Sequence, residues 1–254
     1  MARLPAIFVG HGAPTLALDE DKGAPLRAWG ETLAGVQAIL CVSAHWERAP
    51  PTIGTRTTAP LVYDFYGFPA ELNDVQYAAP GAPELAERVQ SLLPSVQRDD
   101  RRGLDHGVWT PLVHMFPNAD VPVLQLSLPS RQGDRGVLAL GRTLAPLRDE
   151  GVLIIGSGNI THNLHMLAPE GTPPASWAAE FDAWCEQALL ARDLDALAEA
   201  RVRGPAFSRN HPTADHWLPL LVTVGAAADS TAAPRFPVLG WELGNLSRRA
   251  VELC

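Results

Sequence analysis

Histidine is the residue type in this chain whose placement points to chemistry. Three of the eight histidines follow apolar runs typical of β-strands: His11 after "AIFVG", His45 after "ILCVSA" and His162 after "LIIGSGNIT". A fourth, His216, lies in "HPTADHW" near the start of an expected helix. Neutral imidazole is a good ligand for a divalent metal such as Fe(II) or Zn(II). These positions suggest a metal site assembled from distant segments.

The segments that must position these histidines alternate between strand-like and helix-like patterns. Short apolar runs rich in β-branched residues occupy residues 6–9, 38–44, 121–126 and 152–156. Helical spacing occurs in residues 82–93, 134–149, 176–200 and about 213–227, where Pro219 is expected to cause a kink or a break. This alternation predicts an α/β fold: one domain, residues 1–254, with a mixed or mostly parallel sheet and helices on both faces.

In an open α/β sheet, ligands gather outside the carboxyl ends of the strands. His11, His45 and His162 are therefore expected on one rim of the sheet, although they are far apart in sequence. The glycines on either side of His11 let the backbone turn sharply and leave room for a ligand. One histidine at a strand end often only bonds a loop carbonyl, but several on a shared rim favour a metal site.

The remaining histidines have less specific settings. His106, in "GLDHGVW", begins an expected helix, where an acid/base role and an ordinary role near the helix terminus are equally compatible with the pattern. His114 falls on an apolar helical pattern and is assigned to packing. His165 is expected in solvent, and His211, before Pro212, is expected in a cap or loop.

Composition excludes several classes of function. A net charge of −8 and a pI of about 5.4 argue against a nucleic acid partner. No apolar run reaches the ~18 residues of a membrane span, and the first residues lack a signal-peptide pattern, so we expect a cytoplasmic protein without a membrane partner. The three cysteines form no C-x-x-C pair, "IGSGN" is not a nucleophile elbow, and "GHGAP" is not a phosphate-binding loop.

Eight motifs, in order along nearly the whole chain, together resemble one known family, the class III extradiol ring-cleavage dioxygenases, and within it the DOPA-dioxygenase-like branch. The motifs are "GHGAP" at 10–14, "SAHW" at 43–46, "YDFYGFP" at 63–69, "YAAPGAP" at 77–83, "DHGVWTPL" at 105–112, "PVLQLSL" at 122–128, "GSGNITHNL" at 156–164 and "HPTADHWLPLL" at 211–221. The resemblance implies a metal-dependent enzyme that opens the ring of a catechol with O2. Its partners would be a small aromatic diol and O2, and a homo-oligomer is left open.

The same resemblance implies roles for individual histidines. His11, His45 and His216 look like metal ligands, His162 matches either a further ligand or the acid/base, and His106 matches a second active-site histidine. Fe(II) is the metal expected for activity, with Zn(II) as an alternative occupant. Where better-known relatives supply a glutamate, this chain has Asp215 beside His216. We favour His216, because consecutive helical side chains point about 100° apart and only one can face the metal.

Several other side chains are candidates for contact with substrate or ligands. Tyr63, Phe65, Tyr66 and Phe68 would form an aromatic wall for a planar ring, although loop packing also explains them. Ser43, Asn159 and Asn163 would orient imidazoles or touch the substrate, although ordinary loop hydrogen bonds explain them as well. The alternative function is a zinc-dependent hydrolase, or a zinc or ligand-binding protein without turnover, whose activity would not respond to O2.

Overall fold

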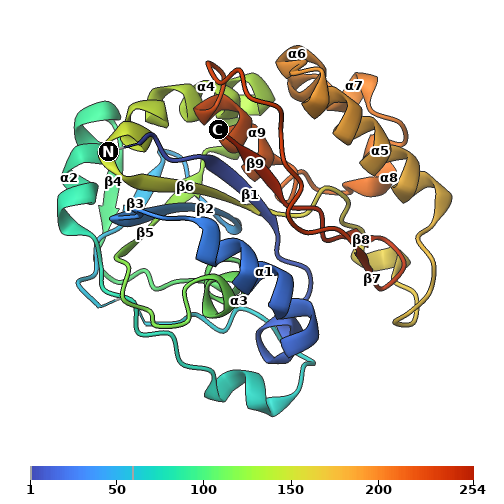
Figure 1. Cartoon of the computed structure of the whole chain (residues 1–254), viewed down its shortest axis with the longest axis horizontal. Helices are drawn as coiled ribbons and strands as arrows, with labels where there is room; N and C mark the ends of the chain where they lie inside the picture. Colours follow the sequence, from blue (N-terminus) through green and yellow to red (C-terminus); the bar gives the residue numbers. More distant parts are fainter. Residues whose placement is uncertain (1, 59) are drawn as a thin grey trace.

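The computed structural model describes residues 2–58 and 60–254, and a seven-stranded sheet crosses its centre (Figure 1). The strand order is β4-β3-β5-β2-β6-β1-β9. Neighbours from β5 to β1 pair in parallel, as do β3 and β4, whereas β9 on β1 and β3 on β5 are antiparallel. The strands are β1 Ala6–Gly10, β2 Ala38–Glu47, β3 Thr52–Gly54, β4 Gln97–Asp99, β5 Val123–Leu128, β6 Val152–Gly158 and β9 Val251–Leu253. β7 (Trp241–Glu242) and β8 (Leu246–Ser247) form a separate hairpin.

Helices cover both faces of the sheet (Figure 1). One layer contains α1 (Glu20–Thr32) and α3 (His106–Met115), and the other contains α4 (Gly133–Leu144) and α9 (Leu218–Ala226). α2 (Pro83–Leu92) packs with the second layer at one edge of the sheet. This layer continues with the long helix α5 (Ser176–Leu190) and three short helices, α6 Leu194–Ala198, α7 Ala200–Arg203 and α8 Phe207–Asn210. The predicted α/β fold with a mostly parallel, mixed sheet is confirmed.

The strands are apolar on both sides because each face has its own core. Along β1, Ile7 and Val9 pack with α1 and α3, while Ala6 and Phe8 pack against α4 and α9. Successive strand side chains point to opposite faces, so a strand buried on both faces needs a continuous apolar run. These continuous runs made β1, β2, β5 and β6 visible in the sequence.

The helix predictions needed three corrections. The segment predicted as 176–200 is broken between α5 and α6, where Arg192 has a φ of 53° and the Asp193 side chain accepts from the backbone N–H of Ala196. The segment predicted as 134–149 ends as an α-helix at Leu144 and continues as a 3-10 turn. Pro219 lies in the first turn of α9, where no backbone donor is needed, so it starts the helix and does not kink it.

Two positions near the site also differ from the sequence prediction. β2 continues to Glu47, so His45 belongs to the strand itself and does not follow it. His216 precedes α9 in a turn and is not helical. Within residues 2–58 and 60–254, none of the helices has both the length and the apolar composition that crossing a bilayer requires.

Candidate metal centre and substrate cavity

Five histidines from five distant segments meet at the carboxyl ends of the central strands. The rings of His11 and His45 have centroids 5.0 Å apart, and His106 lies 3.9 Å from His45. His216 lies 4.9 Å from His45, and His162 stacks on His216 with centroids 3.4 Å apart and planes 8° apart. The shared rim predicted for His11, His45 and His162 is present, and both His106 and His216 belong to the same cluster.

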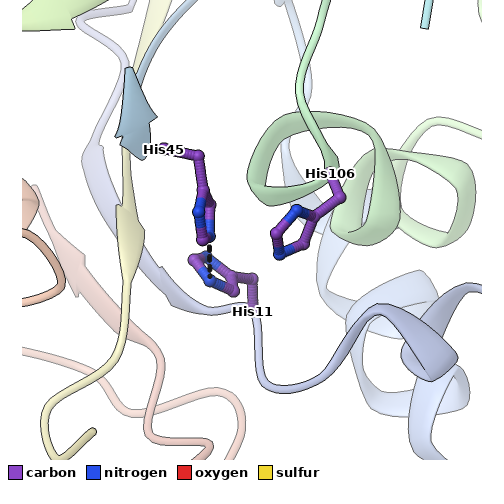
Figure 2. A group of neighbouring side chains, drawn as sticks. All are labelled: His11, His45 and His106. Carbon is purple, nitrogen blue, oxygen red and sulfur yellow. Dashed lines mark hydrogen bonds between the residues drawn. The ribbon is translucent and has the colours of Figure 1, made fainter. Parts of the chain in front are cut away.

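Three of the five rings, drawn in Figure 2, bring possible ligand atoms close enough together to hold one metal ion. His11, His45 and His106 each offer one nitrogen, and these atoms all lie within 4.8 Å of one another. The two Nε2 atoms of His11 and His45 are 3.1 Å apart. Imidazole nitrogens bind transition metals at about 2.0–2.1 Å, so two ligands of one ion are separated by roughly 3.0–3.4 Å. The observed spacing, at which the two rings share a hydrogen bond in the absence of an ion, also fits two ligands of one ion.

The surroundings of His11 fix its proton on the nitrogen that faces away from His45. The hydroxyl of Ser157 donates to the carbonyl of Gly107 and therefore accepts from Nδ1–H of His11, at 2.9 Å. With the proton on Nδ1, the Nε2 atom of His11 carries a lone pair. A hydrogen bond to one imidazole nitrogen commonly orients the other toward a metal.

Two carboxylates orient other members of the cluster. Nδ1–H of His106 donates to Oδ1 of Asp64 at 2.9 Å, and the backbone N–H of His106 donates to the same atom at 3.0 Å. Nδ1–H of His216 donates to Oδ2 of Asp215 at 2.6 Å. Asp215 is thus the hydrogen-bond partner of His216. The two carboxylates also place negative charge close to where a divalent cation would bind.

Burial lowers the pKa of four of these histidines, His11, His45, His162 and His216, and so favours the neutral form that metal ligation requires. Burial, followed by the nearby His45, lowers the pKa of His11 well below its ordinary value. Burial and the adjacent His106 lower the pKa of His45 to about 4, and burial lowers that of His162 to about 4 against the opposing effect of Asp215. The pKa of Asp64 is about 2, because the hydrogen bonds from His106 outweigh the effect of burial.

Glycines allow the segments to approach closely enough for the cluster to form. A Cβ at Gly107 would lie 2.5 Å from Oγ of Ser43 and 2.9 Å from Cδ2 of His45, so only glycine lets the first turn of α3 rest against β2. A Cβ at Gly158 would lie 2.3 Å from the carbonyl oxygen of His216. Each glycine therefore sets the position of a neighbouring histidine.

The cluster forms the polar floor of a cavity of about 310 Å³. Besides the five histidines and Asp64, the lining is mostly apolar. The apolar members are Ala13, Pro14, Phe65, Phe68, Leu164, Leu167, Leu243 and Leu246, with Gly12 and Tyr66 beside them. A cavity of this size with a few convergent polar groups suits a small aromatic ligand.

The predicted substrate contacts are divided between the cavity and its surroundings. Phe65 and Tyr66 line the cavity. Tyr63 lies behind this lining, where its hydroxyl donates to the carbonyl of Val75 at 2.9 Å and its ring packs against Trp109. Asn159 is fully buried and its amide donates to the carbonyl of Ser247. Contact of Tyr63 and Asn159 with substrate therefore stays a prediction that this arrangement does not favour.

The other polar candidates have support roles in the structure. The Ser43 hydroxyl donates to the buried Asp105 at 2.7 Å and accepts from the backbone N–H of His45. The Asn163 side chain accepts from the backbone N–H of His165 and donates to the carbonyl of Arg209. Ser43 thus fixes the backbone that carries a candidate ligand, whereas Asn163 holds its own loop.

The histidines assigned outside the site lie where the sequence indicated, with one refinement. His114 is buried and its Nε2 donates to the carbonyl of Leu16 at 2.8 Å, and His165 is exposed. His211 caps the C-terminus of α8, but it is also 97% buried, with Nε2 bonded to the carbonyl of Ile160 at 2.8 Å. It therefore joins the end of α8 to the loop after β6.

Sequence reasoning missed several residues of the site. Asp64 stood within "YDFYGFP" and was the only carboxylate of that motif, which is a signal that could have been used. Ser157 was considered only as a nucleophile. Glu242 accepts from the backbone N–H of Ala13 and so holds the loop after His11. Its hairpin also contributes Leu243 and Leu246, and nothing in the sequence of that hairpin indicates proximity to residues near 11.

Comparison with known proteins identifies the family. Residues 6–241 match the family model described as the catalytic LigB subunit of aromatic ring-opening dioxygenase. The chain belongs to the LigB family. The resemblance inferred from the sequence motifs is therefore confirmed, and the histidine cluster lies within the matched region.

Relatives in the LigB family match along most of their length. A protein of Beta vulgaris named 4,5-DOPA dioxygenase extradiol is 43% identical, over 89% of this chain and 88% of that protein. One of the same name from Escherichia coli K12 is 38% identical, over 99% of this chain and 95% of the relative. A crystal structure of an uncharacterized protein from Escherichia coli K12 matches with a TM-score of 0.84 and 35% identity, over 99% of this chain and 100% of that one.

Proposed function

We propose that this LigB-family protein is a metal-dependent extradiol dioxygenase that opens the aromatic ring of a catechol with O2. The observation that carries the proposal is the group of buried and half-buried imidazoles at the floor of an apolar cavity, with Nε2 atoms of His11 and His45 at ligand spacing. The relatives named as 4,5-DOPA dioxygenases support the reaction class and make a DOPA-like catechol a candidate substrate.

His11 and His45 are the proposed metal ligands, with His216 as the third. The donor set fits a divalent ion, because the nitrogens are neutral and the Nδ1 atoms of His11 and His216 are anchored by hydrogen bonds. The close group also admits His106 as a ligand in place of His216. Fe(II) is the proposed metal for activity, and an all-imidazole set also suits Zn(II).

The metal, when bound, would increase the acidity of a catechol hydroxyl and bring the diol and O2 together. His162 is proposed to accept a catechol proton, because its lowered pKa keeps the ring neutral and it lines the cavity. His106 holds its Nδ1 proton on Asp64, which leaves Nε2 free to accept or share a proton from the substrate. Phe65 would pack against the ring and exclude water.

Oxygen uptake by the reconstituted protein tests this proposal. The metal-free protein would be loaded anaerobically with Fe(II) and mixed with DOPA, caffeate or protocatechuate, while O2 and visible absorbance are followed. Uptake with a new visible absorbance is expected for at least one catechol, and His45→Ala should abolish it. His165→Ala is the matched control, because His165 is exposed and outside the cavity lining. Absence of uptake with every catechol under every metal would refute the proposal.

The family match does not favour the alternative of a zinc hydrolase or a binding protein without turnover. That alternative would show tightly bound zinc, together with ligand binding or hydrolysis that does not depend on O2.

We further propose that residues 1–254 act as one catalytic domain in the cytoplasm, with a small aromatic diol and O2 as partners and without nucleic acid or membrane. The central sheet that runs through the structure supports one domain, and the acidic composition argues against a nucleic acid partner.

A further inference from the structure

The strand β2 is irregular where it carries His45. Its register with β5 shifts between Val42 and Glu47, so that the segment 43–46 forms a bulge. The backbone N–H of His45 donates to the hydroxyl of Ser43 at 3.2 Å. A bulge interrupts the hydrogen bonds between strands and turns a side chain in a new direction. The position of His45 therefore depends on what holds Ser43.

Asp105 holds Ser43 from the neighbouring helix. Its Oδ1 accepts from the Ser43 hydroxyl at 2.7 Å. Asp105 is the N-cap residue of α3, where an aspartate side chain ordinarily accepts from the first N–H groups of the helix. Within the part of the chain that the structure describes, it makes no such bond and faces β2 instead. Its carboxylate thus holds the strand of His45, while its backbone starts the helix that begins with His106 (Figure 2).

Two further side chains hold the Asp105 carboxylate. Its Oδ2 accepts from Arg102 at 2.7 Å and from the side-chain amide of Gln125 on β5. The side-chain oxygen of Gln125 also accepts from the backbone N–H of Asp105 at 3.4 Å. Asp105 is fully buried, and a buried carboxylate is costly without such partners. These bonds account for a buried glutamine in a largely apolar strand.

Arg102 contacts the bulge at a second point. Its guanidinium lies over the ring of Trp46, 4.9 Å from the ring centroid. The face of an indole ring attracts a guanidinium in this position. Ser43 and Trp46, which lie before and after His45 in the chain, are therefore both tied to one carboxylate, the first directly and the second through Arg102.

We propose that Asp105 is a positioning residue of the metal site, whose contacts with Ser43 and Arg102 fix the bulge that carries His45 relative to the start of α3. The inference rests on the proposed function, because it concerns a ligand assigned there. It adds a role for a carboxylate that is not among the residues lining the cavity. Hydrogen-bond partners of this kind hold a ligand at its binding distance without contacting the metal.

Removal of one hydroxyl tests the inference. Ser43→Ala breaks the link between Asp105 and His45. Ser127→Ala is the matched control, because Ser127 is also buried and its hydroxyl accepts from the backbone N–H of Thr52. Only Ser43→Ala should raise the Kd for Zn(II), by about 10- to 100-fold. The Co(II)-loaded Ser43→Ala protein should also have an altered visible absorption spectrum, which reports the geometry of the ligands.

A second variant tests the route through Asp105. Gln125→Met removes both contacts of Gln125 with Asp105 at similar volume, and it should also weaken Zn(II) binding. When Ser43→Ala and Gln125→Met are combined, the loss of affinity should be smaller than the product of the two single losses, because both changes act on one carboxylate. Single losses that simply multiply would overturn the inference.

The measurements separate a failure of this inference from a failure of the proposed function. Unchanged Zn(II) affinity with an unchanged Co(II) spectrum in Ser43→Ala would overturn the inference alone. An equal loss of Zn(II) affinity in Ser127→Ala would do the same, because it would show a general effect of losing a buried hydroxyl. If the unaltered protein binds none of Zn(II), Co(II) and Fe(II), the metal assignment of the proposed function is refuted together with this inference.

Discussion

Nε2 of His11 and Nε2 of His45 lie 3.1 Å apart, although His11 follows β1, His45 lies in β2, and the two are 34 positions apart in sequence. Because Ser157 holds the proton of His11 on Nδ1, the facing Nε2 atom is available as a ligand. The pairing of two imidazoles in this orientation is the arrangement that a bound cation would stabilise.

Metal removal should therefore lower thermal stability in the unaltered protein. A ligand that binds only the folded state, at a free concentration of about 100 times its Kd, adds about 2.7 kcal/mol to the free energy of unfolding. Chelation should shift Tm down by several degrees, and Fe(II) or Zn(II) should restore it. His45→Ala should show no response to either treatment, and an equal response in both proteins would contradict the assignment.

The identity of the third ligand can be decided by metal content. His216→Ala should lose most of the bound metal, whereas His106→Ala should retain about one ion per chain while losing activity. The opposite pattern would make His106 the ligand, which its place in the close three-histidine group allows. Elemental analysis after dialysis measures the metal content of each variant, and O2 uptake measures its activity. His165→Ala serves as the control that keeps metal and activity.

Asp64→Asn should reduce activity while leaving the fold intact. The amide removes the charge that holds Nδ1–H of His106, and loss of such a partner typically costs about 10- to 100-fold in activity or metal affinity. Asp74→Asn is the control, because Asp74 is exposed and belongs to the following short helical turn. A similar kcat/KM for the two variants would show that Asp64 does not position His106.

The sequence predicted those parts of the fold that depend on local pattern. β1, β2, β5 and β6 were predictable because strands covered on both faces must be apolar throughout. In the sheet, β1 and β2 lie on either side of β6, so the carboxyl ends of both strands bring His11 and His45 to the same rim. The break between α5 and α6 was hidden, because the alanine- and leucine-rich pattern continues through it and only Asp193 marks a new cap.

The walls of the site were less predictable than its histidines. Imidazoles are rare and chemically distinct, so their positions after apolar runs carry information. Leu243 and Leu164 are ordinary loop leucines, and their proximity depends on how the β7-β8 hairpin packs against the loop after β6, where the N–H of Ala168 bonds the carbonyl of Leu243. Such long-range loop contacts leave no periodic signal in one sequence.

Gly107→Ala should damage the site more than a typical surface substitution. The added methyl group would lie 2.5 Å from Oγ of Ser43, so α3 must move away from β2 and carry His106 with it. Overpacking of this kind costs about 1–3 kcal/mol of stability. Gly54→Ala is the control, because its nearest contact would be an ordinary 3.5 Å. Urea unfolding and metal affinity should both change in Gly107→Ala alone.

The pH dependence of stability should contain a contribution from His211. Burial lowers the pKa of this histidine from 6.5 to about 3, so below pH 6.5 the unfolded chain binds a proton that the folded chain does not. Stability therefore falls as pH decreases from 6.5 toward 3, by up to about 1.4 kcal/mol per pH unit for this group.

The variant His211→Gln tests this contribution, because its amide can donate to the carbonyl of Ile160 but cannot titrate. The variant should be less stable than the unaltered protein at pH 7.5, and the gap should narrow by about 2 kcal/mol at pH 5 in urea unfolding, because the other buried histidines titrate equally in both. A gap that stays constant with pH would mean that His211 has the same pKa in the folded and the unfolded protein.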